Sequence, residues 1–438
     1  MISTTDTAII GAGPYGLSIS AHLSDAGVPH QVLGEPMLAW RNFMPPGMLM
    51  RSEAFASDLY APHAGYRLED YCRLMHLPYA PIGMRLPLER FVEYGLWFQS
   101  QLVGHVRPVD VTELRRQDDG FLLSLSDGSA LAARRVVVAL GLKGFEQTPT
   151  VLQGLPRPHV LHSGEIGNLA WARGKRIVIV GGGQSALGLA ALFNELGAHV
   201  RVLVRGGIIS WNEDPEVGRS LLSRMLRPEG GLAQGWYPYV LSEFPYLFRG
   251  VGQRTRKRIA EASFGPSGAW WLRDRVAGKI ELRMNTTVRH VAIRNDEVVL
   301  EVSGENGPAT ITGDHVVAAT GFKVDLARHA FLSPEIVSAL SLVDGWSDVS
   351  RNFESAMPGL YITGPASALS FGPVLRFVYG AKYAAPRIAR HISRCHAAEG
   401  GSRAFDAPAV PQPLAESRTG VLSHPPAAAF QEAKSPAE

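Results

Sequence analysis

Two short glycine-rich segments hold the residue types best suited to chemistry in this 438-residue chain. The first, residues 11–16, has the pattern GxGxxG and lies between the apolar run 7–10 and a segment with helical spacing. The second, residues 181–186, has the pattern GxGxxA and follows the apolar run 177–180 in the same way. A glycine loop between a strand and a helix presents free backbone N–H groups to a pyrophosphate. The two loops therefore predict two dinucleotide sites.

Each glycine of the first loop is expected to have its own task. Gly11 permits the tight turn, Gly13 lets the backbone approach a pyrophosphate, and Gly16 lets the helix pack closely on the strand. Gly181 and Gly183 would do the same in the second loop. The residues that open the two helices complete the predicted contacts: Pro14, Tyr15, Gln184 and Ser185.

The residue that follows the second strand of each unit distinguishes the two sites. In the first unit the strand 30–33 is followed by Gly34, and the acid expected to bind a ribose comes one residue later, at Glu35. In the second unit the strand 199–204 ends at Arg205, whose cation suits a ribose 2′-phosphate better than a bare hydroxyl. We therefore expect NADPH at the second site, with NADH as the alternative. The competing interpretation of Arg205 is a solvated residue at a strand end.

The elements around the loops also recur. The first loop is followed by apolar strands at 111–114, 121–125 and 136–141, and the second by strands at 288–291, 298–302 and 316–321. Alternating strands separated by Asp-Gly and Gly-Glu-Asn-Gly turns indicate hairpins. A last apolar strand, 359–363, leads to a helix expected to begin near Pro373 and to end near His391. The whole order predicts a duplicated α/β fold.

Composition narrows the class of protein further. The chain is 46% hydrophobic and 19% charged, which excludes a disordered or fibrous protein. Its 43 basic and 40 acidic residues predict no nucleic-acid partner. No apolar run approaches the roughly 18 residues of a membrane span, so we expect a cytoplasmic protein without a membrane partner. The basic cluster 254–258 is interpreted as a solvated helix face or a contact in a homodimer.

Two cysteines, Cys72 and Cys395, lie far apart in the sequence and form no CxxC pair. This spacing predicts neither a disulfide framework nor a cysteine-based zinc site. His159 and His162 lack carboxylate or cysteine companions at ligand spacing, so no metal is expected.

The order of loops, meanders and final strand resembles the flavoproteins with two dinucleotide-binding domains. The resemblance implies an α/β fold in which a Rossmann-like NAD(P)H domain is inserted into a split FAD domain. The implied FAD domain comprises residues 1–165 and 319–394, and the NAD(P)H domain comprises 166–318 with an insertion at 211–271. Residues 395–438, rich in Ala, Pro, Ser and Glu, are expected to form a disordered tail.

The resemblance also implies where the cofactors bind. The first loop would hold FAD, and Gly364 with the Phe371-Gly372 helix start would lie against the flavin. Trp40 and Phe371 are candidates to wall the isoalloxazine, although aromatic side chains of this kind are often ordinary core. Further positions implied to contact a cofactor are Val111, Gly141, Thr320 and Gly321.

Within that superfamily, the stretch ending Thr320-Gly321-Phe322 and the absence of a cysteine pair resemble the class B flavin monooxygenases and amine N-hydroxylases. Segments 40–53 and 371–377 resemble a bacterial branch that includes FAD-dependent urate hydroxylases. The implied activity is insertion of one oxygen atom from O2 into a small polar substrate through a flavin C4a-hydroperoxide, with urate hydroxylation to 5-hydroxyisourate as the first choice.

Arg51 and Arg376, one in each branch-specific segment, are candidates to position an anionic or carbonyl-rich substrate. Either arginine could instead neutralise a pyrophosphate or form a structural ion pair. Two other activities stay open: N-hydroxylation of a primary amine such as ornithine or lysine, and reduction of an external acceptor by NAD(P)H.

Overall fold

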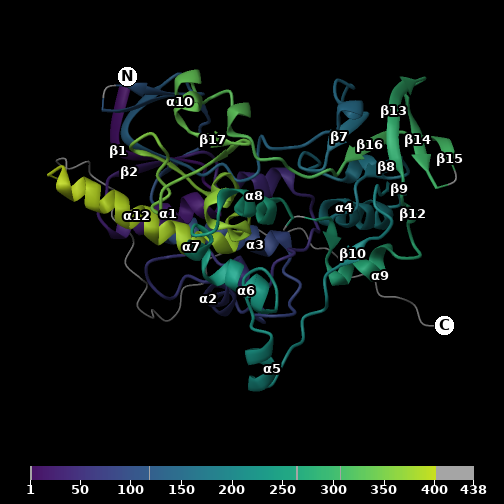
Figure 1. The fold of residues 1–438 in the computed structure, drawn as a ribbon, viewed down its shortest axis with the longest axis horizontal. Coiled ribbons are helices and arrows are strands. Elements are labelled where there is room, and N and C mark those ends of the chain that lie inside the picture. The colour runs from purple at the N-terminus through teal and green to yellow at the C-terminus, as the bar shows by residue number, and fades with distance from the viewer. Residues whose placement is uncertain (1, 118, 263–264, 306, 401–438) are drawn as a thin grey trace, which may run out of the picture.

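The protein was studied as a computed structural model that describes residues 2–117, 119–262, 265–305 and 307–400. Two predominantly parallel sheets lie side by side, each with helices packed against it (Figure 1). We call the part built on the N-terminal sheet the first lobe and the part built on the other sheet the second lobe. The predicted α/β fold with two Rossmann-like units is confirmed.

The sheet of the first lobe has the strand order β3-β2-β1-β6-β5-β4, and β19 also pairs with β6. Its strands are β1 (Ile2–Ile10), β2 (His30–Leu33), β3 (Val106–Arg107), β4 (Val111–Gln117), β5 (Gly120–Leu125), β6 (Ala130–Val138) and β19 (Leu360–Ile362). β1, β2, β3, β6 and β19 run parallel, whereas β4, β5 and β6 form an antiparallel meander. The apolar ends of β1, β6 and β19 are buried at the centre of the core because helices cover them.

Three helices pack together in the first lobe: α1 (Pro14–Asp25), α3 (Leu88–Leu102) and α12 (Ala381–Ala398). The short helix α2 (Leu68–Leu74) packs on α3. Smaller elements complete the lobe: α10 (Pro334–Ala339), β17 (Leu342–Val343), β18 (Trp346–Ser347) and α11 (Ala368–Phe371).

The second lobe has the parallel strand order β12-β9-β8-β16-β7. These strands are β7 (Val160–His162), β8 (Arg176–Val180), β9 (His199–Leu203), β12 (Glu281–Arg283) and β16 (His315–Ala318). Helices α4 (Gln184–Glu195) and α9 (Arg273–Val276) pack together in this lobe. An antiparallel sheet of β13 (Thr287–Arg294), β14 (Glu297–Gly304) and β15 (Gly307–Gly313) shares a second apolar core with β8 and β16.

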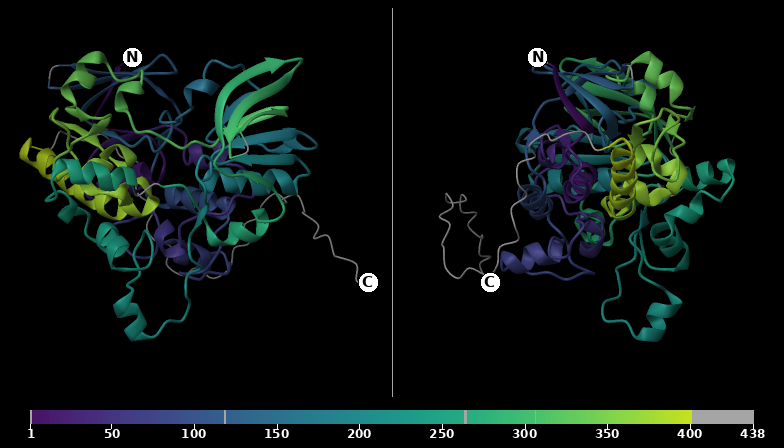
Figure 2. Two further views of the ribbon diagram at one scale, coloured as in Figure 1. Left: turned by 45° about the vertical axis from the view of Figure 1, so that its right-hand side comes forward. Right: turned by 90° about the vertical axis from the view of Figure 1, so that its left-hand side faces the viewer.

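The segment between β9 and β12 carries the predicted insertion. It contains β10 (Ser210–Trp211), α5 (Leu221–Leu226), α6 (Trp236–Glu243), α7 (Pro245–Phe248), α8 (Gln253–Ala262) and β11 (Ser267–Gly268). Although β10 and β11 join the insertion to the second lobe, α7 and α8 contact α11 of the first lobe. α5 projects away from both lobes (Figure 2). The insertion therefore bridges the lobes.

The structure differs from the expected domain bounds at two places. β7 lies before the expected boundary at 165/166, but it pairs with β16 and so belongs to the second sheet. The helix expected to begin near Pro373 starts as two short 3-10 turns, and α12 then runs to Ala398, so residues 395–398 are helical rather than part of a tail. Residues 401–438 of the predicted tail lie outside the described residues.

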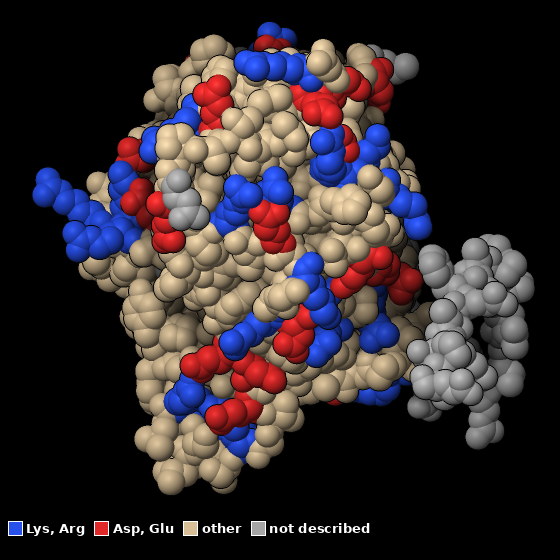
Figure 3. Space-filling model, turned by 90° about the vertical axis from the view of Figure 1, so that its right-hand side faces the viewer, with Lys and Arg blue, Asp and Glu red and all other residues tan. Residues whose placement is uncertain are grey.

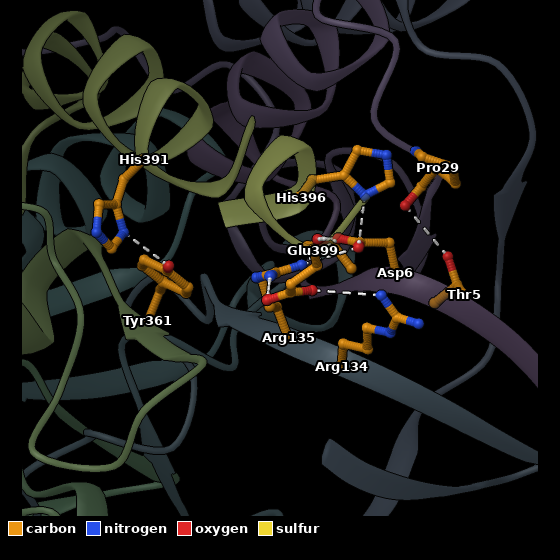
Figure 4. A network of polar contacts seen from close by, with 10 residues as sticks. Thr5, Asp6, Pro29, Arg134, Arg135, Tyr361, His391, His396 and Glu399 are labelled. Carbon is orange, nitrogen blue, oxygen red and sulfur yellow. Dashed lines mark hydrogen bonds and ion pairs between the residues drawn. The ribbon is translucent and has the colours of Figure 1, made fainter. Parts of the chain in front are cut away.

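A polar network fastens the C-terminal end of α12 to the first sheet (Figure 4). Asp6 of β1 accepts hydrogen bonds from Arg135 Nη1 of β6 at 2.8 and 2.9 Å, and its Oδ2 lies 2.8 Å from His396 Nδ1. Glu399 pairs with Arg135 and Arg134. Burial alone would raise the pKa of Asp6, but hydrogen bonds from His396 and Thr7 and the charge of Arg135 outweigh it and lower that pKa. Asp6 is therefore a carboxylate held by charge-assisted contacts.

Candidate functional site

The backbone of the first glycine loop has room for no larger residue at two of its positions. Gly11 has a φ of +111°, and a Cβ there would lie 2.4 Å from the Ala139 carbonyl oxygen. A Cβ on Gly16 would lie 1.8 Å from the Gly11 carbonyl oxygen. A Cβ on Gly13, by contrast, would meet nothing within 4 Å. The loop is thus tight on its protein side and open at the N-terminus of α1, where a pyrophosphate would approach.

A cavity of about 160 Å³ lies beside this loop. It brings together most of the residues predicted for the first site: Gly11, Gly13, Pro14, Tyr15, Glu35, Trp40, Val111, Gly141 and Gly364. Gly34 has a φ of +116°, and the turn it makes brings Glu35, one residue late in the sequence pattern, to the cavity wall. These residues, contributed by distant parts of the chain, fit a dinucleotide cradle.

Two aromatic side chains fix the walls of this cavity. Trp40 packs edge-on against Phe91 of α3, with ring centroids 4.8 Å apart. Tyr15 donates its hydroxyl hydrogen to the carbonyl oxygens of Leu375 and Phe377, each 2.8 Å away. Complete burial raises the pKa of Tyr15, so the hydroxyl stays protonated and acts as a donor. Tyr15 therefore joins α1 to the segment that follows α11.

The second glycine loop repeats the first with one change. Gly181 has a φ of +144°, and a Cβ there would lie 2.2 Å from the Ala319 carbonyl oxygen. Ala186, fully buried, replaces the third glycine. The side chain of Gln184 accepts a hydrogen bond from the Ala269 N–H at 2.8 Å, whereas Ser185 is exposed. Arg205 is also exposed, two residues beyond β9. This loop has the backbone of a dinucleotide site and lies open to solvent.

Thr320 and Gly321 lie at the crossing between the lobes. The Thr320 hydroxyl donates to the Gln147 carbonyl, and the Gly321 carbonyl oxygen lies 3.0 Å from His162 Nε2. Phe322 packs edge-on against the His162 ring at 5.3 Å. Burial lowers the pKa of His162, which favours a neutral imidazole. These contacts hold the crossing strands together.

A larger cavity of about 440 Å³ opens between the first lobe and the insertion. Arg51 lines it and bridges the two parts of the molecule: its Nη2 donates to Ser267 Oγ at 2.6 Å and to Asn212 Oδ1 at 3.1 Å. Burial lowers the pKa of Arg51, although the guanidinium remains charged at neutral pH. The cavity is large enough for a small organic substrate.

Acidic side chains dominate the polar lining of this larger cavity: Glu53, Glu213, Asp214 and Glu229. Glu53 Oε2 accepts the Gly83 N–H at 2.7 Å. Burial, followed by the charges of Asp214 and Glu229, raises the pKa of Glu53. Arginines pair with only some of these carboxylates, Arg227 with Glu213 at 2.8 Å and Arg219 with Glu229 at 2.7 Å. A cation in the cavity would relieve the repulsion around Glu53.

Three residues of the cavity lining each carry a buried N–H donor without a hydrogen-bond partner among the described residues. They are the indole nitrogens of Trp270 and Trp271 and the side-chain amide of Gln234, atoms that are themselves covered although their residues line the cavity. Buried donors of this kind are costly unless something else accepts their hydrogen bonds.

Phe371 and Arg376 lie apart from both cavities. Phe371 is fully buried and stacks on Phe353, with ring centroids 4.1 Å apart. Burial lowers the pKa of Arg376 to about 10, and its side chain lines neither cavity. Gly372 has a φ of +86° and makes the turn between the two, where a Cβ would approach Phe248 at 3.3 Å. Phe371 is therefore part of the packed core, and its place beside a flavin stays a prediction.

The insertion supplies several cavity residues that the sequence did not point to, among them Asn212, Tyr237, Ser267 and Trp270. Its short helices have no long apolar repeat, and the only signal there was the density of aromatic residues and prolines. Both cysteines are free, Cys72 in the core and Cys395 on α12. Within the described ranges, no group of three or more His, Cys, Asp or Glu could hold a metal ion. Nor does any described helix have the length and apolarity to cross a lipid bilayer.

A family model described as pyridine nucleotide-disulphide oxidoreductase matches residues 5–230. A ferredoxin–NADP reductase of Streptococcus pneumoniae (strain Hungary19A-6) is 31% identical over 101 residues, covering 22% of this chain and 31% of the relative. That of Paracidovorax citrulli (strain AAC00-1) is 28% identical over 212 residues, covering 44% of this chain and 47% of the relative. The matches thus span 31% and 47% of the length of these relatives.

Solved structures match over far more of the chain. The reduced ornithine hydroxylase of Pseudomonas aeruginosa has a TM-score of 0.71 at 17% identity and covers 89% of this chain and 99% of its own. A cadaverine monooxygenase of Erwinia amylovora, bound to FAD, has a TM-score of 0.64 at 16% identity, with coverages of 95% and 100%. A bacillithiol disulfide reductase of Bacillus cereus has a TM-score of 0.60 at 18% identity, with coverages of 90% and 100%. The whole fold is shared with these proteins.

Proposed function

The chain belongs to the pyridine nucleotide-disulphide oxidoreductase family, and from that premise we propose that it is an FAD-dependent, NADPH-dependent monooxygenase that hydroxylates the nitrogen of a primary amine. The two nucleotide loops support the cofactors, and the acidic cavity supports the amine. The fold shared with an ornithine hydroxylase and a cadaverine monooxygenase agrees with this chemistry.

In this proposal the first loop holds FAD and the second holds NADPH. Gly13 admits the FAD pyrophosphate to the N-terminus of α1, and Glu35 binds the adenosine ribose. Arg205 meets the 2′-phosphate of NADPH. Bound FAD would accept a hydride from NADPH and activate O2. The protein residues bind and orient these groups and exclude water, and the proposed division of tasks keeps the domain bounds 1–165, 166–318 and 319–394 except that β7 is counted with the NADPH domain.

The observation that supports an amine substrate is the negative charge of the residues lining the larger cavity. Glu53 lies near Asp214 and Glu229, so an ammonium group would be attracted and an anion such as urate repelled. Arg51 already donates to Ser267 and Asn212, which leaves it less available to an anionic ring. We therefore prefer an amine over the urate expected from the sequence, and we propose that Glu53 anchors its ammonium group.

A substrate panel tests the proposal. NADPH consumption is followed with cadaverine, ornithine, lysine, urate and a thioether, while hydroxylamine, other organic products and hydrogen peroxide are quantified. Hydroxylamine formation that matches NADPH consumption for one amine is expected. Glu53→Gln should raise the KM for that amine at least tenfold, whereas Glu335→Gln, an exposed carboxylate on α10, should leave it unchanged. Urate loss matching NADPH consumption would replace the amine with urate.

A second candidate function is an NAD(P)H:acceptor reductase. It is favoured by the curated relatives, which are named ferredoxin–NADP reductases. Under anaerobic conditions with NADPH, rapid reduction of ferricyanide, quinone or ferredoxin would support it. If every organic substrate gives only peroxide while these acceptors are reduced rapidly, the reductase replaces the monooxygenase.

A further inference from the structure

The projecting part of the insertion, residues 213–234, forms an arm around α5. Its own polar contacts fix its conformation. Arg219, whose side chain is only 3% exposed, pairs with Glu229 and donates to the Arg227 carbonyl oxygen at 2.7 Å. Arg227 in turn pairs with Glu213, and Ser220 caps α5 by accepting the Ser223 N–H. The arm is therefore an ordered element with a defined face.

The face that this arm presents to solvent is apolar. The exposed fractions are 78% for Leu221, 67% for Leu222, 70% for Met225 and 66% for Leu226. The lowest part of the molecule in Figure 3, where α5 projects in Figure 1, is correspondingly poor in charged side chains. Single exposed apolar residues are normal on a protein surface, but contiguous groups mark interaction sites.

A second apolar group lies next to the arm on α6, α7 and the junction between them. Its exposed members are Trp236, Tyr237, Val240, Phe244, Tyr246 and Leu247. With the four residues of the arm this makes ten large apolar side chains that are each at least 37% exposed, a group on the scale of the roughly 800 Å² that each partner of a stable complex contributes. A surface of this size and composition fits a permanent interface.

The charges near the arm favour a protein partner over an anionic membrane. The two arginines at its root, Arg219 and Arg227, are paired with carboxylates of the arm itself. Arg224 is the remaining basic residue of the arm, which also carries the acidic residues Asp214 and Glu216. Surface binding to anionic lipid relies on a cluster of basic residues, which this arm lacks.

We propose that the occupant of this surface is a second copy of the chain, bound about a two-fold axis so that α5 of each copy packs on the α6–α7 face of the other. A two-fold interface uses the same two patches twice, which suits an arm and a neighbouring face on one molecule. Tyr237 belongs to the face and also lines the larger cavity. The arm of the second copy therefore narrows the mouth of that cavity.

The first test is the oligomeric state of the purified full chain with its cofactor, measured by sedimentation velocity from about 0.1 to 10 µM, the affinity range of ordinary protein complexes. A dimer is expected for the wild type and for the control Leu74→Glu, which alters a 59% exposed residue on α2, outside the proposed interface. The double variant Leu222→Glu/Met225→Glu should be a monomer with unchanged flavin content and thermal unfolding. A monomeric wild type, or a double variant that stays dimeric, overturns the proposal.

The second test addresses the exchange of arms. Leu222→Cys and Val240→Cys chains, both also carrying Cys395→Ser to remove the accessible native thiol, are mixed, allowed to exchange and treated with a short bismaleimide. Cross-links between the two kinds of chain are expected, whereas cross-links only between two Leu222→Cys chains would overturn the packing of α5 on α6. Wild-type protein that is monomeric and pellets with zwitterionic lipid vesicles would make the surface a membrane contact instead. None of these readouts depends on the reaction that the enzyme catalyses.

Discussion

The two glycine loops share a backbone and differ in their surroundings. In both, the first glycine lies against a carbonyl oxygen of the neighbouring strand end, Ala139 for Gly11 and Ala319 for Gly181. The first loop, however, faces a cavity walled by distant segments, whereas Ser185 and Arg205 beside the second are exposed. We infer that the first loop suits a nucleotide that stays bound through many turnovers. The second loop suits a nucleotide that is exchanged in every catalytic cycle.

The largest effect is expected at the third position of the loop motif, where the first loop has Gly16 and the second has Ala186. Gly16→Ala places a methyl group 1.8 Å from the Gly11 carbonyl oxygen, so the helix must move and we expect loss of flavin and of folded protein. The reverse change in the other loop, Ala186→Gly, removes a methyl group and should cost only about 1–2 kcal/mol. Flavin absorbance per chain and thermal unfolding of both variants measure the contrast. Equal behaviour of the two variants would contradict it.

The second prediction concerns the open position of each loop. Gly13→Leu fills the space in front of α1 where the pyrophosphate would lie, and the protein should be purified without flavin. The matched variant Gly183→Leu should keep its flavin, and its KM for NADPH should rise at least tenfold. Full flavin content in Gly13→Leu would remove FAD from the first loop.

A smaller effect is expected at Arg205. Arg205→Ala should raise the KM for NADPH about 10-fold to 150-fold, equivalent to about 1.5–3 kcal/mol for a lost charge-assisted contact, and leave the KM for NADH unchanged. Arg173→Ala, an exposed arginine before β8, serves as control. Parallel changes for both coenzymes would show that Arg205 does not meet the 2′-phosphate.

The smallest expected effect is a difference between the two lobes in how their stability depends on pH. The pKa of Asp6 is lowered below its ordinary value of 3.8, so its contribution to stability is complete above pH 3.8 and is lost as the pH falls through the lower folded value. Asp314 has a lowered pKa because of Arg176, but its side chain is more exposed. Acid should therefore loosen the first lobe more.

The measurement is release of fluorescent flavin between pH 5 and pH 2.5, with denaturant unfolding in parallel. Asp6→Asn should flatten the acid limb of the unfolding free energy, and Asp314→Asn should change it less. An acid limb that is the same in Asp6→Asn and the wild type would show that the network in Figure 4 does not carry this dependence.

The sequence predicted those parts of the molecule whose signal is local. Each glycine loop, its flanking strand and its helix lie within about 25 residues, the length over which a strand, turn and helix pattern is readable. β7 was assigned to the wrong lobe because it has three residues and its partner, β16, lies far along the chain. For Phe371 the motif reveals the residue type but not that the Phe353 ring stacks on it. The structure of the insertion was the hardest to predict from the sequence, because short helices carry little hydrophobic periodicity.

The hydrogen bonds of Tyr15 have a consequence for how such an enzyme could diversify. They tie α1, the helix that begins in the first glycine loop, to the carbonyl groups of Leu375 and Phe377. Phe377 is also part of the wall of the larger cavity. Substitutions in that part of the wall would also disturb the cofactor site, so its sequence should vary little. Other wall residues of the larger cavity belong to the insertion, and none of the insertion's described residues lines the cavity beside the first loop. New substrate preferences should therefore arise by exchange of the insertion, and chimeras joined at β10 and β11 are the natural way to transplant them.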